Sequence, residues 1–170
     1  MLQRFNTCRI TPAYLFSVLA LSLALTACGF HLRQSASIAF KTAYITGTTA
    51  INKPLTKALK EQDVKVVSSA DDAELQVELM KEENEQRILS LSGTGVVREY
   101  ELYYRVQYRT KAIGEATWGL PLTMESRRDY TYNDANLLAK QTEQQSLMEN
   151  MRTEVMNGIL RRISALKKAQ

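Results

Sequence analysis

The residues with the clearest chemistry stand at the end of the N-terminal apolar run, in the stretch Leu25-Thr26-Ala27-Cys28. A branched apolar residue, two small residues and a cysteine form a lipobox, the motif at which bacterial lipoproteins are modified. The thiol of Cys28 is the nucleophile that accepts a diacylglyceryl group, and the small neighbours let a peptidase reach the bond before it. The alternative is an ordinary buried cysteine that follows a signal peptide. We expect Cys28 to be lipidated, and we expect no cofactor besides this covalent lipid.

The segment before Cys28 has the layout of a secretory signal peptide. The cations Arg4 and Arg9 precede a run of thirteen mostly apolar residues, 13–25. This run is shorter than the roughly 20 apolar residues that a membrane-spanning helix needs. We therefore expect residues 1–27 to be cleaved after export.

The mature chain that this predicts has a lipidated N-terminal tether, residues 28–40, and a single folded domain, residues 41–170. Gly29 follows the cysteine where an aspartate would retain an enterobacterial lipoprotein in the inner membrane, so we expect the outer membrane. Cys8 leaves with the signal peptide, which excludes an internal disulfide. Cleavage also lowers the formal charge from +4 to +2, which is too small to argue for a nucleic-acid partner.

The residue types needed for catalysis or metal binding are not brought together by the sequence. His31 is the sole histidine and lies three residues from Cys28, so neither a Ser-His-Asp arrangement nor a multi-histidine metal site can form. The stretch SGTGVV at 92–97 lacks the lysine of a P-loop and joins two predicted strands, which indicates a hairpin turn. The sequence predicts a protein that is not an enzyme and holds no metal.

Short periodic stretches open the predicted domain. Thr42–Thr46 predicts a strand, and residues 52–62 predict an amphipathic helix with Pro54 near its start. Residues 64–67 are a second short apolar stretch. Residues 74–80 alternate strictly between apolar and polar, which is typical of a strand with one buried face.

Residues 84–110 are typical of two long strands joined by a tight turn at Ser92-Gly93-Thr94-Gly95. One face of the second strand is apolar and aromatic: Val96, Tyr100, Leu102, Tyr104, Val106 and Tyr108. Its other face is polar and charged: Glu99, Glu101, Tyr103, Arg105, Gln107 and Arg109. Arginines flanked by tyrosines suit an anionic amphiphile, whereas acids and bases that alternate across strands give the same composition. Composition does not separate these two interpretations.

Residues 116–132 predict a further strand, which Gly119 and Pro121 interrupt and so place at a sheet edge or a bulge. A long helix is expected to start at Asn133 or Asp134. Its apolar stripe recurs at spacings of three and four: Leu137, Leu138, Met148, Met151, Val155, Ile159, Ile163 and Leu166. The order of the elements predicts a mixed sheet with both helices on one face, and it leaves the other face for a partner or ligand.

Three motifs in order carry a resemblance to a known family: CGFHLR at 28–33, REYELYYRVQYR at 98–109 and RDYTYNDANLLAKQTEQ at 128–144. They resemble the LptE family of lipopolysaccharide-assembly lipoproteins. The resemblance implies an α+β two-layer sandwich, with a mixed four-stranded sheet and two helices on one face. It also implies a non-enzymatic role in the outer membrane. By this resemblance we expect the chain to plug the lumen of the LptD β-barrel in a one-to-one complex, to help that barrel to assemble, and to bind lipopolysaccharide.

The family's ligand contacts carry over only where this sequence matches. Lys140 stands where the family has a lysine implicated in lipopolysaccharide binding, and Arg128 also matches the family pattern; both would pair with phosphate groups. A family arginine just before the hairpin glycine is absent here, and Arg87 and Arg98 are the candidates to replace it. The alternative function is a free-standing lipoprotein carrier or chaperone for an amphiphile, which predicts an apolar pocket between sheet and helices.

Overall fold

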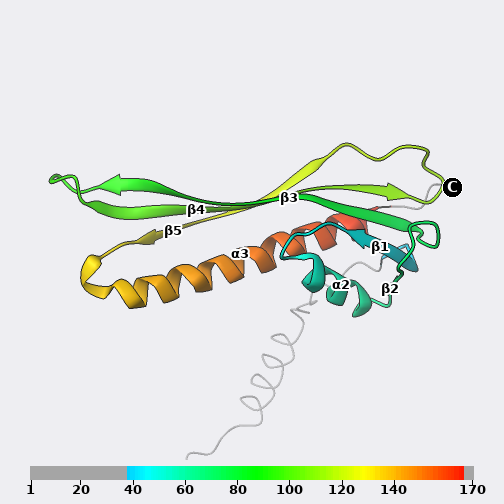
Figure 1. The fold of residues 1–170 in the computed structure, drawn as a ribbon, viewed down its shortest axis with the longest axis horizontal. Coiled ribbons are helices and arrows are strands. Elements are labelled where there is room, and N and C mark those ends of the chain that lie inside the picture. The colour runs from blue at the N-terminus through cyan, green and yellow to red at the C-terminus, as the bar shows by residue number, and fades with distance from the viewer. Residues whose placement is uncertain (1–37, 167–170) are drawn as a thin grey trace, which may run out of the picture. The chain divides into compact units, whose positions relative to one another are not determined.

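The computed structural model describes residues 38–166, which form a five-stranded mixed sheet with helices on one face (Figure 1). In chain order the elements are β1 (Thr42–Thr46), α2 (Asn52–Lys60), β2 (Lys65–Val66), β3 (Leu75–Leu91), β4 (Val97–Ala112), β5 (Leu122–Thr131), the 3-10 turn η1 (Asp134–Asn136) and α3 (Leu137–Ala165). The strands lie in the order β2-β1-β3-β4-β5. β1 is parallel to both of its neighbours, and the other pairs are antiparallel. The predicted α+β class and mixed sheet are confirmed.

The expectation of four strands is wrong by one, because residues 64–67 join the sheet as β2. The Lys65 amide donates to the Lys41 carbonyl at 2.9 Å, and the Val67 amide donates to the Ala43 carbonyl at 2.9 Å. These bonds pair β2 in parallel with β1. A strand of two residues is too short to show an alternating pattern, so the sequence alone did not reveal it.

The helix α2 links β1 to β2 and buries Leu55 and Leu59 against the sheet. It starts without a side-chain cap, and the side-chain amide of Asn52 instead donates to the Gly47 carbonyl at 2.7 Å. Gly47 has a φ of 118°, and a Cβ atom there would lie 2.2 Å from the Leu79 carbonyl oxygen. Only glycine fits this close approach between β1 and β3.

One continuous strand, β3, replaces the separate strands that the pattern indicates at 74–80 and 84–91. A β-bulge between Leu79 and Lys81 leaves Met80 without a cross-strand partner in β4. Before the bulge the odd-numbered side chains lie on the helix face, and from Glu82 to Ile88 the even-numbered ones do. The bulge reverses the alternation within a single strand, and this is why the sequence reads as two.

The apolar face predicted for the next strand is confirmed in β4, where Leu102, Tyr104, Val106 and Tyr108 are buried. Val96 is the exception, because it lies in the hairpin turn beyond the core and is 55% exposed. The following strand, β5, starts directly after the proline at 121 and forms an edge of the sheet, as predicted.

The long helix α3 follows the turn η1, where the Asn133 side chain accepts a hydrogen bond from the Ala135 amide at 2.9 Å. Its buried stripe contains Met151, Val155, Ile159 and Ile163, as predicted. Leu137 and Leu138 do not belong to this stripe, because they are 45% and 79% exposed. This first turn of α3 lies beside the last residues of the edge strand β5, where Lys140 donates to the Thr131 hydroxyl.

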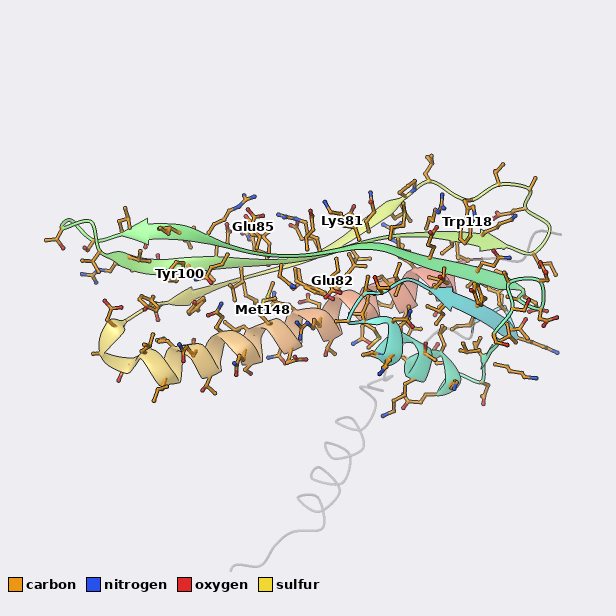
Figure 2. All side chains as sticks on the ribbon, viewed as in Figure 1. Lys81, Glu82, Glu85, Tyr100, Trp118 and Met148 are labelled. Atoms are coloured by element: carbon orange, nitrogen blue, oxygen red, sulfur yellow. The ribbon has the colours of Figure 1, made fainter. Side chains whose placement is uncertain are left out.

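The layer between sheet and helices has two unlike halves. Near α2 it is packed with apolar side chains, most of them aliphatic: Phe40, Ala43, Ile51, Leu55, Leu59, Val64, Leu75, Val77, Leu79, Val155, Ile159 and Ile163. Toward the hairpin it is aromatic and polar. Tyr100 stacks on Tyr130 with ring centroids 5.8 Å apart and meets Tyr132 edge-on at 5.2 Å (Figure 2 labels Tyr100). There Gln144 of α3 donates to the Gln86 side chain at 2.9 Å.

Glu82 joins the sheet to the segment before α2. One carboxylate oxygen accepts from the Tyr104 hydroxyl at 2.9 Å, and the other accepts from the Ala50 amide at 2.6 Å. Burial, and then the hydrogen bond to Glu82, raise the pKa of Tyr104. The buried phenol therefore stays protonated at pH values where an exposed tyrosine ionises.

Candidate functional site

Lys140 sits at the start of α3, next to the end of β5. Its ammonium group donates to the Thr131 hydroxyl at 3.2 Å and to the Glu143 carboxylate at 2.7 Å. Asn133 caps the turn η1 between β5 and α3, and this tight reversal brings Lys140 to Thr131. Lys140 is thus held by one partner from each element, and its side chain is 19% exposed.

Arg128 lies on β5 and reaches across to the middle of α3. One guanidinium nitrogen donates to the Glu154 carboxylate at 2.7 Å, and another donates to the Arg127 carbonyl at 2.7 Å. The same Glu154 oxygen accepts from the buried Ser126 hydroxyl at 2.7 Å. Glu154 therefore ties the edge strand to the helix through two donors.

The two predicted ligand residues share the flank formed by β5 and α3, but they contact different acids. Arg128 and Thr131, the partner of Lys140, are three residues apart on β5, which corresponds to about 10 Å along a strand. Each cation pairs with a carboxylate at a partly exposed position, and such pairs contribute about 0.2–1 kcal/mol. A phosphate group is therefore able to compete with Glu143 and Glu154 for these cations.

Arg87 and Arg98, the two candidates to replace the missing family arginine, lie on opposite faces of the hairpin. Arg87 is on the face away from the helices, where it pairs with Glu85 at 2.6 Å and lies 4.8 Å from the Tyr103 ring centre. Arg98 is exposed and shares the β4 face of the buried tyrosines, and its carbonyl accepts from the Tyr132 amide at 2.8 Å. Arg98 is thus on the same side of the sheet as Lys140 and Arg128.

The sheet face away from the helices, called the open face below, carries a network of ion pairs. Six ion pairs join its cations to acids of the same or the neighbouring strand: Lys81–Glu83, Arg87–Glu85, Arg105–Glu85, Arg105–Glu125, Arg109–Glu78 and Arg127–Glu101. Hydrogen bonds from Arg87 and Arg105 lower the pKa of Glu85. The structure therefore has the alternation of acids and bases across strands, rather than a row of cations left for an anionic amphiphile.

Aromatic rings complete this network. The guanidinium groups of Arg87 and Arg105 lie 4.8 Å and 4.4 Å from the centre of the Tyr103 ring, and Arg109 lies 4.8 Å from that of Trp118. Such contacts hold the long arginine side chains flat on the sheet. Figure 2 shows Lys81, Glu85 and Trp118 on this face, opposite Glu82 and Met148.

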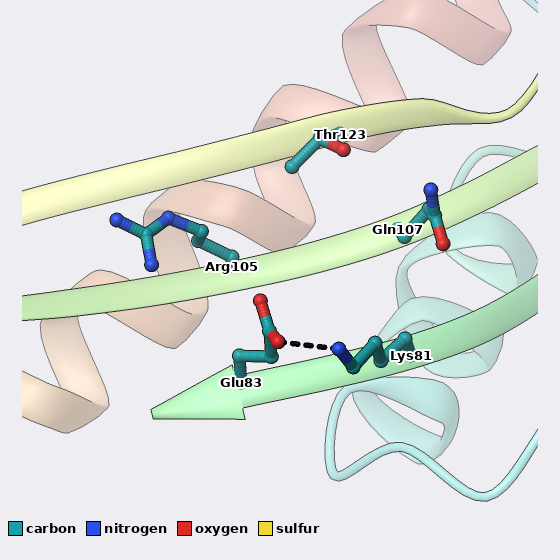
Figure 3. Close-up of a pocket in the computed structure, with 5 residues that line it drawn as sticks. All are labelled: Lys81, Glu83, Arg105, Gln107 and Thr123. Carbon is teal, nitrogen blue, oxygen red and sulfur yellow. Dashed lines mark ion pairs between the residues drawn. The ribbon is translucent and has the colours of Figure 1, made fainter. Parts of the chain in front are cut away.

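A shallow hollow of about 140 Å³ lies in the open face, lined by Lys81, Glu83, Arg105, Gln107 and Thr123 (Figure 3). Lys81 and Glu83, both on β3, pair along one side of it at 2.5 Å. The hollow offers charges of both signs, an amide and a hydroxyl, which suits contact with a polar surface. Within residues 38–166 there is no group of three or more His, Cys, Asp or Glu side chains placed to hold a metal ion.

Residues 39–163 match the model of the family described as "LptE: Lipopolysaccharide-assembly". The match spans nearly all of the part of the chain that the structure describes. The chain belongs to the LptE family. This confirms the resemblance carried by the three motifs, two of which lie within the matched residues.

Relatives of this LptE-family chain agree with the assignment. The LPS-assembly lipoprotein LptE of Pectobacterium atrosepticum is 27% identical over 160 residues, which cover 90% of this chain and 86% of the relative. The solution structure of lipoprotein B from Nitrosomonas europaea has a TM-score of 0.67 and 34% identity, covering 81% of this chain and 91% of that one. The crystal structure of rare lipoprotein B from Shewanella oneidensis has a TM-score of 0.66 and 28% identity, and the match covers 73% of this chain and 94% of that one.

Some predictions fall on the N-terminal part of this LptE-family chain. Cys28, the cleavage before it and most of the 28–40 tether lie outside the described residues, so they stay predictions. None of the helices in the described part is both long and apolar enough to cross a bilayer.

Sequence reasoning named the cations of the β5–α3 flank but missed their acidic partners. The spacing of Lys140 and Glu143, three residues apart on a helix, is a local signal that predicts their pairing. Glu154 gives no such signal, because it reaches Arg128 only through the packing of α3 against β5. Arg98 does carry a local signal, because it is two residues before Tyr100 on β4 and the alternation of the strand puts both on one face.

Proposed function

We propose that this chain is an outer-membrane lipoprotein, lipidated at Cys28, that plugs the lumen of an LptD β-barrel and assists its assembly. In this role it forms a one-to-one complex with the barrel and binds lipopolysaccharide on its way to the outer leaflet. The observation that carries the proposal is the LptE family match over residues 39–163. A plug works by contact alone, so the proposed function needs no catalytic residue.

The open face supports a protein partner. Most of its charges are already paired within the sheet, for example Arg105 with both Glu85 and Glu125. Paired charges lose less free energy than isolated ones when a partner removes water from them. A polar protein wall therefore suits this face better than an apolar ligand does.

The β5–α3 flank supports the binding of lipopolysaccharide phosphates. Lys140, Arg128 and Arg98 lie on one side of the sheet, and the first two hold weak, partly exposed ion pairs. A phosphate carries up to two negative charges and three acceptor oxygens, so it attracts these cations more strongly than one carboxylate does. In the bound state Glu143 and Glu154 would give up their cations.

The free-standing carrier is less well supported. It requires an apolar pocket between sheet and helices, and the apolar part of that layer is filled by the packed core. A surface hollow at the hairpin is lined mostly by polar residues, including Ser92, Thr94, Arg98 and Asn133.

One purification tests the plug. The tagged full-length protein is extracted from outer membranes in mild detergent, and the bound proteins are quantified. We expect one large β-barrel in equal molar amount. Recovery of the lipoprotein alone would overturn the plug and favour the carrier.

A second experiment tests the anchor. Cys28→Ala should leave the precursor uncleaved and unlabelled by radioactive palmitate, whereas Cys8→Ala, the matched control in the signal peptide, should be processed and labelled normally. Normal labelling of Cys28→Ala would show that the lipid is not on this cysteine.

A further inference from the structure

The segment that joins β4 to β5 is an exposed apolar loop with very little charge. The segment called the 112–124 loop below runs from the last residue of β4 to the first three residues of β5, and its sequence AIGEATWGLPLTM contains one charged side chain, Glu115. Ile113 is 55% exposed, Leu120 is 86% exposed and Leu122 is 40% exposed. Leu120 is the most exposed large apolar residue of the described chain. Exposed apolar clusters of this kind mark contact sites.

The loop is fixed against the end of the sheet. The Gly119 amide donates to the Thr110 carbonyl at 2.9 Å, and Trp118 packs against the Arg109 guanidinium at 4.8 Å. The Glu115 carboxylate accepts from the Ala112 amide at 2.9 Å, so the single charge is bonded within the loop. The exposure of Leu120 therefore belongs to an ordered loop.

The loop lies at the end of the sheet where the described chain begins. Glu74 connects the two: its amide donates to the Thr42 hydroxyl at 2.9 Å, and its carbonyl accepts from the Ile113 amide at 2.7 Å. Its carboxylate accepts from the Lys41 amide at 2.6 Å. The chain entering β1 is thus two strand spacings, about 10 Å, from the strand that leads into the loop.

Chain length limits where the lipid of Cys28 can be. Ten residues, 28–37, separate it from the described chain, and they span at most about 36 Å. The other uncharged apolar segment, 88–97, lies at the far end of β3, a strand of 17 residues and about 56 Å. Of the two segments, the 112–124 loop is the one at the anchored end.

We propose that the 112–124 loop inserts Ile113, Leu120 and Leu122 into the surface of the phospholipid bilayer that holds the lipid anchor. The driving force is apolar, because the charged residues that line the hollow beside Ile113 are two acids, Asp71 and Glu115, and one base, Lys111, which together give no net attraction to anionic headgroups. Trp118 suits this position, since tryptophan favours the membrane interface. The inference rests on the proposed lipidation of Cys28 and not on the barrel.

The chain carries a built-in probe, because Trp118 is its only tryptophan and lies in this loop. The mature lipidated protein is reconstituted into phosphatidylethanolamine and phosphatidylglycerol vesicles, with either ordinary or brominated acyl chains. Flotation first measures how much protein is on the vesicles. Tryptophan fluorescence is then compared between the two vesicle types, since bromine quenches only at short range.

We expect brominated vesicles to quench most of the Trp118 emission. Leu120→Glu should remove most of this quenching while the protein still floats. The control Leu89→Glu changes a 46% exposed leucine of the 88–97 segment, at the other end of the sheet, and should leave the quenching unchanged. Floating protein without quenching, or equal quenching in Leu120→Glu, would overturn the insertion. A blue shift without quenching would also overturn it, in favour of a protein contact such as a second copy. Protein that does not float would overturn the anchor itself and this inference with it.

Discussion

The two halves of the layer between sheet and helices differ in chemistry and in what they carry. The half near α2 is filled by fully buried apolar residues such as Leu55, Val77 and Ile159. The half near the hairpin is built from tyrosines and glutamines, and the helix above it keeps Leu138 79% exposed. The cations proposed to bind lipopolysaccharide flank this second half.

This difference separates stability from binding. A close-packed apolar half supplies free energy of folding but offers no polar group to a ligand. The polar half gains less from burial, yet it holds cations at the surface on weak pairs that a ligand can replace. Substitutions in the apolar half should therefore change the free energy of unfolding, and substitutions in the polar half should change lipopolysaccharide binding.

The largest effect is expected from the apolar half. Ile159→Ala leaves a cavity at a position with 0% exposure, so the free energy of unfolding should fall by about 2–5 kcal/mol. The control, Leu138→Ala on the same helix, should change it by less than about 0.5 kcal/mol. Urea unfolding measures both. Equal losses would mean that the two ends of α3 are packed alike.

How much the sequence could predict depends on whether a feature is local along the chain. Alternation over 74–80 and over β4 identified the buried face correctly, because each side chain there obeys a local period of two. The bulge at Met80 and the two-residue β2 were not foreseen, since both depend on pairing between strands. For the site, the cations Lys140 and Arg128 came from family motifs, whereas their partners Glu143 and Glu154 came from the structure.

The next effect concerns Glu82, at the boundary between the halves. Tyr104→Phe removes a hydrogen bond to a carboxylate, and bonds to charged groups contribute about 1.5–3 kcal/mol, so unfolding should become easier by roughly that amount. Because the pKa of Tyr104 is raised in the folded state, its contribution is complete below about pH 10, the pKa of an unfolded tyrosine, and is lost as the pH rises further. Urea unfolding at alkaline pH should show a smaller decline in Tyr104→Phe. If stability at alkaline pH fell equally in the variant and the wild type, the fall would come from other tyrosines, such as Tyr108.

A smaller effect, on binding and not on folding, is expected from the polar half. Lys140→Glu reverses a charge at a partly exposed position and should weaken lipopolysaccharide binding by up to about 2 kcal/mol, twice the upper value for an exposed pair. Glu143→Gln releases the same lysine from its acid and should strengthen binding. The dissociation constants of the two variants, measured on folded protein, check this. Unchanged affinity in both would remove Lys140 from the site.

The smallest expected effect distinguishes the two hairpin arginines. Arg98 is exposed on the side of Lys140 and Arg128, whereas Arg87 is held on the open face by Glu85 and the Tyr103 ring. Arg98→Glu should therefore weaken lipopolysaccharide binding by about 1 kcal/mol, and Arg87→Glu should leave it unchanged. Both variants change the charge of the same hairpin by the same amount, so a general electrostatic effect would weaken lipopolysaccharide binding equally in both. A loss confined to Arg87→Glu would instead move the ligand to the open face and reverse the roles of the two faces of the sheet.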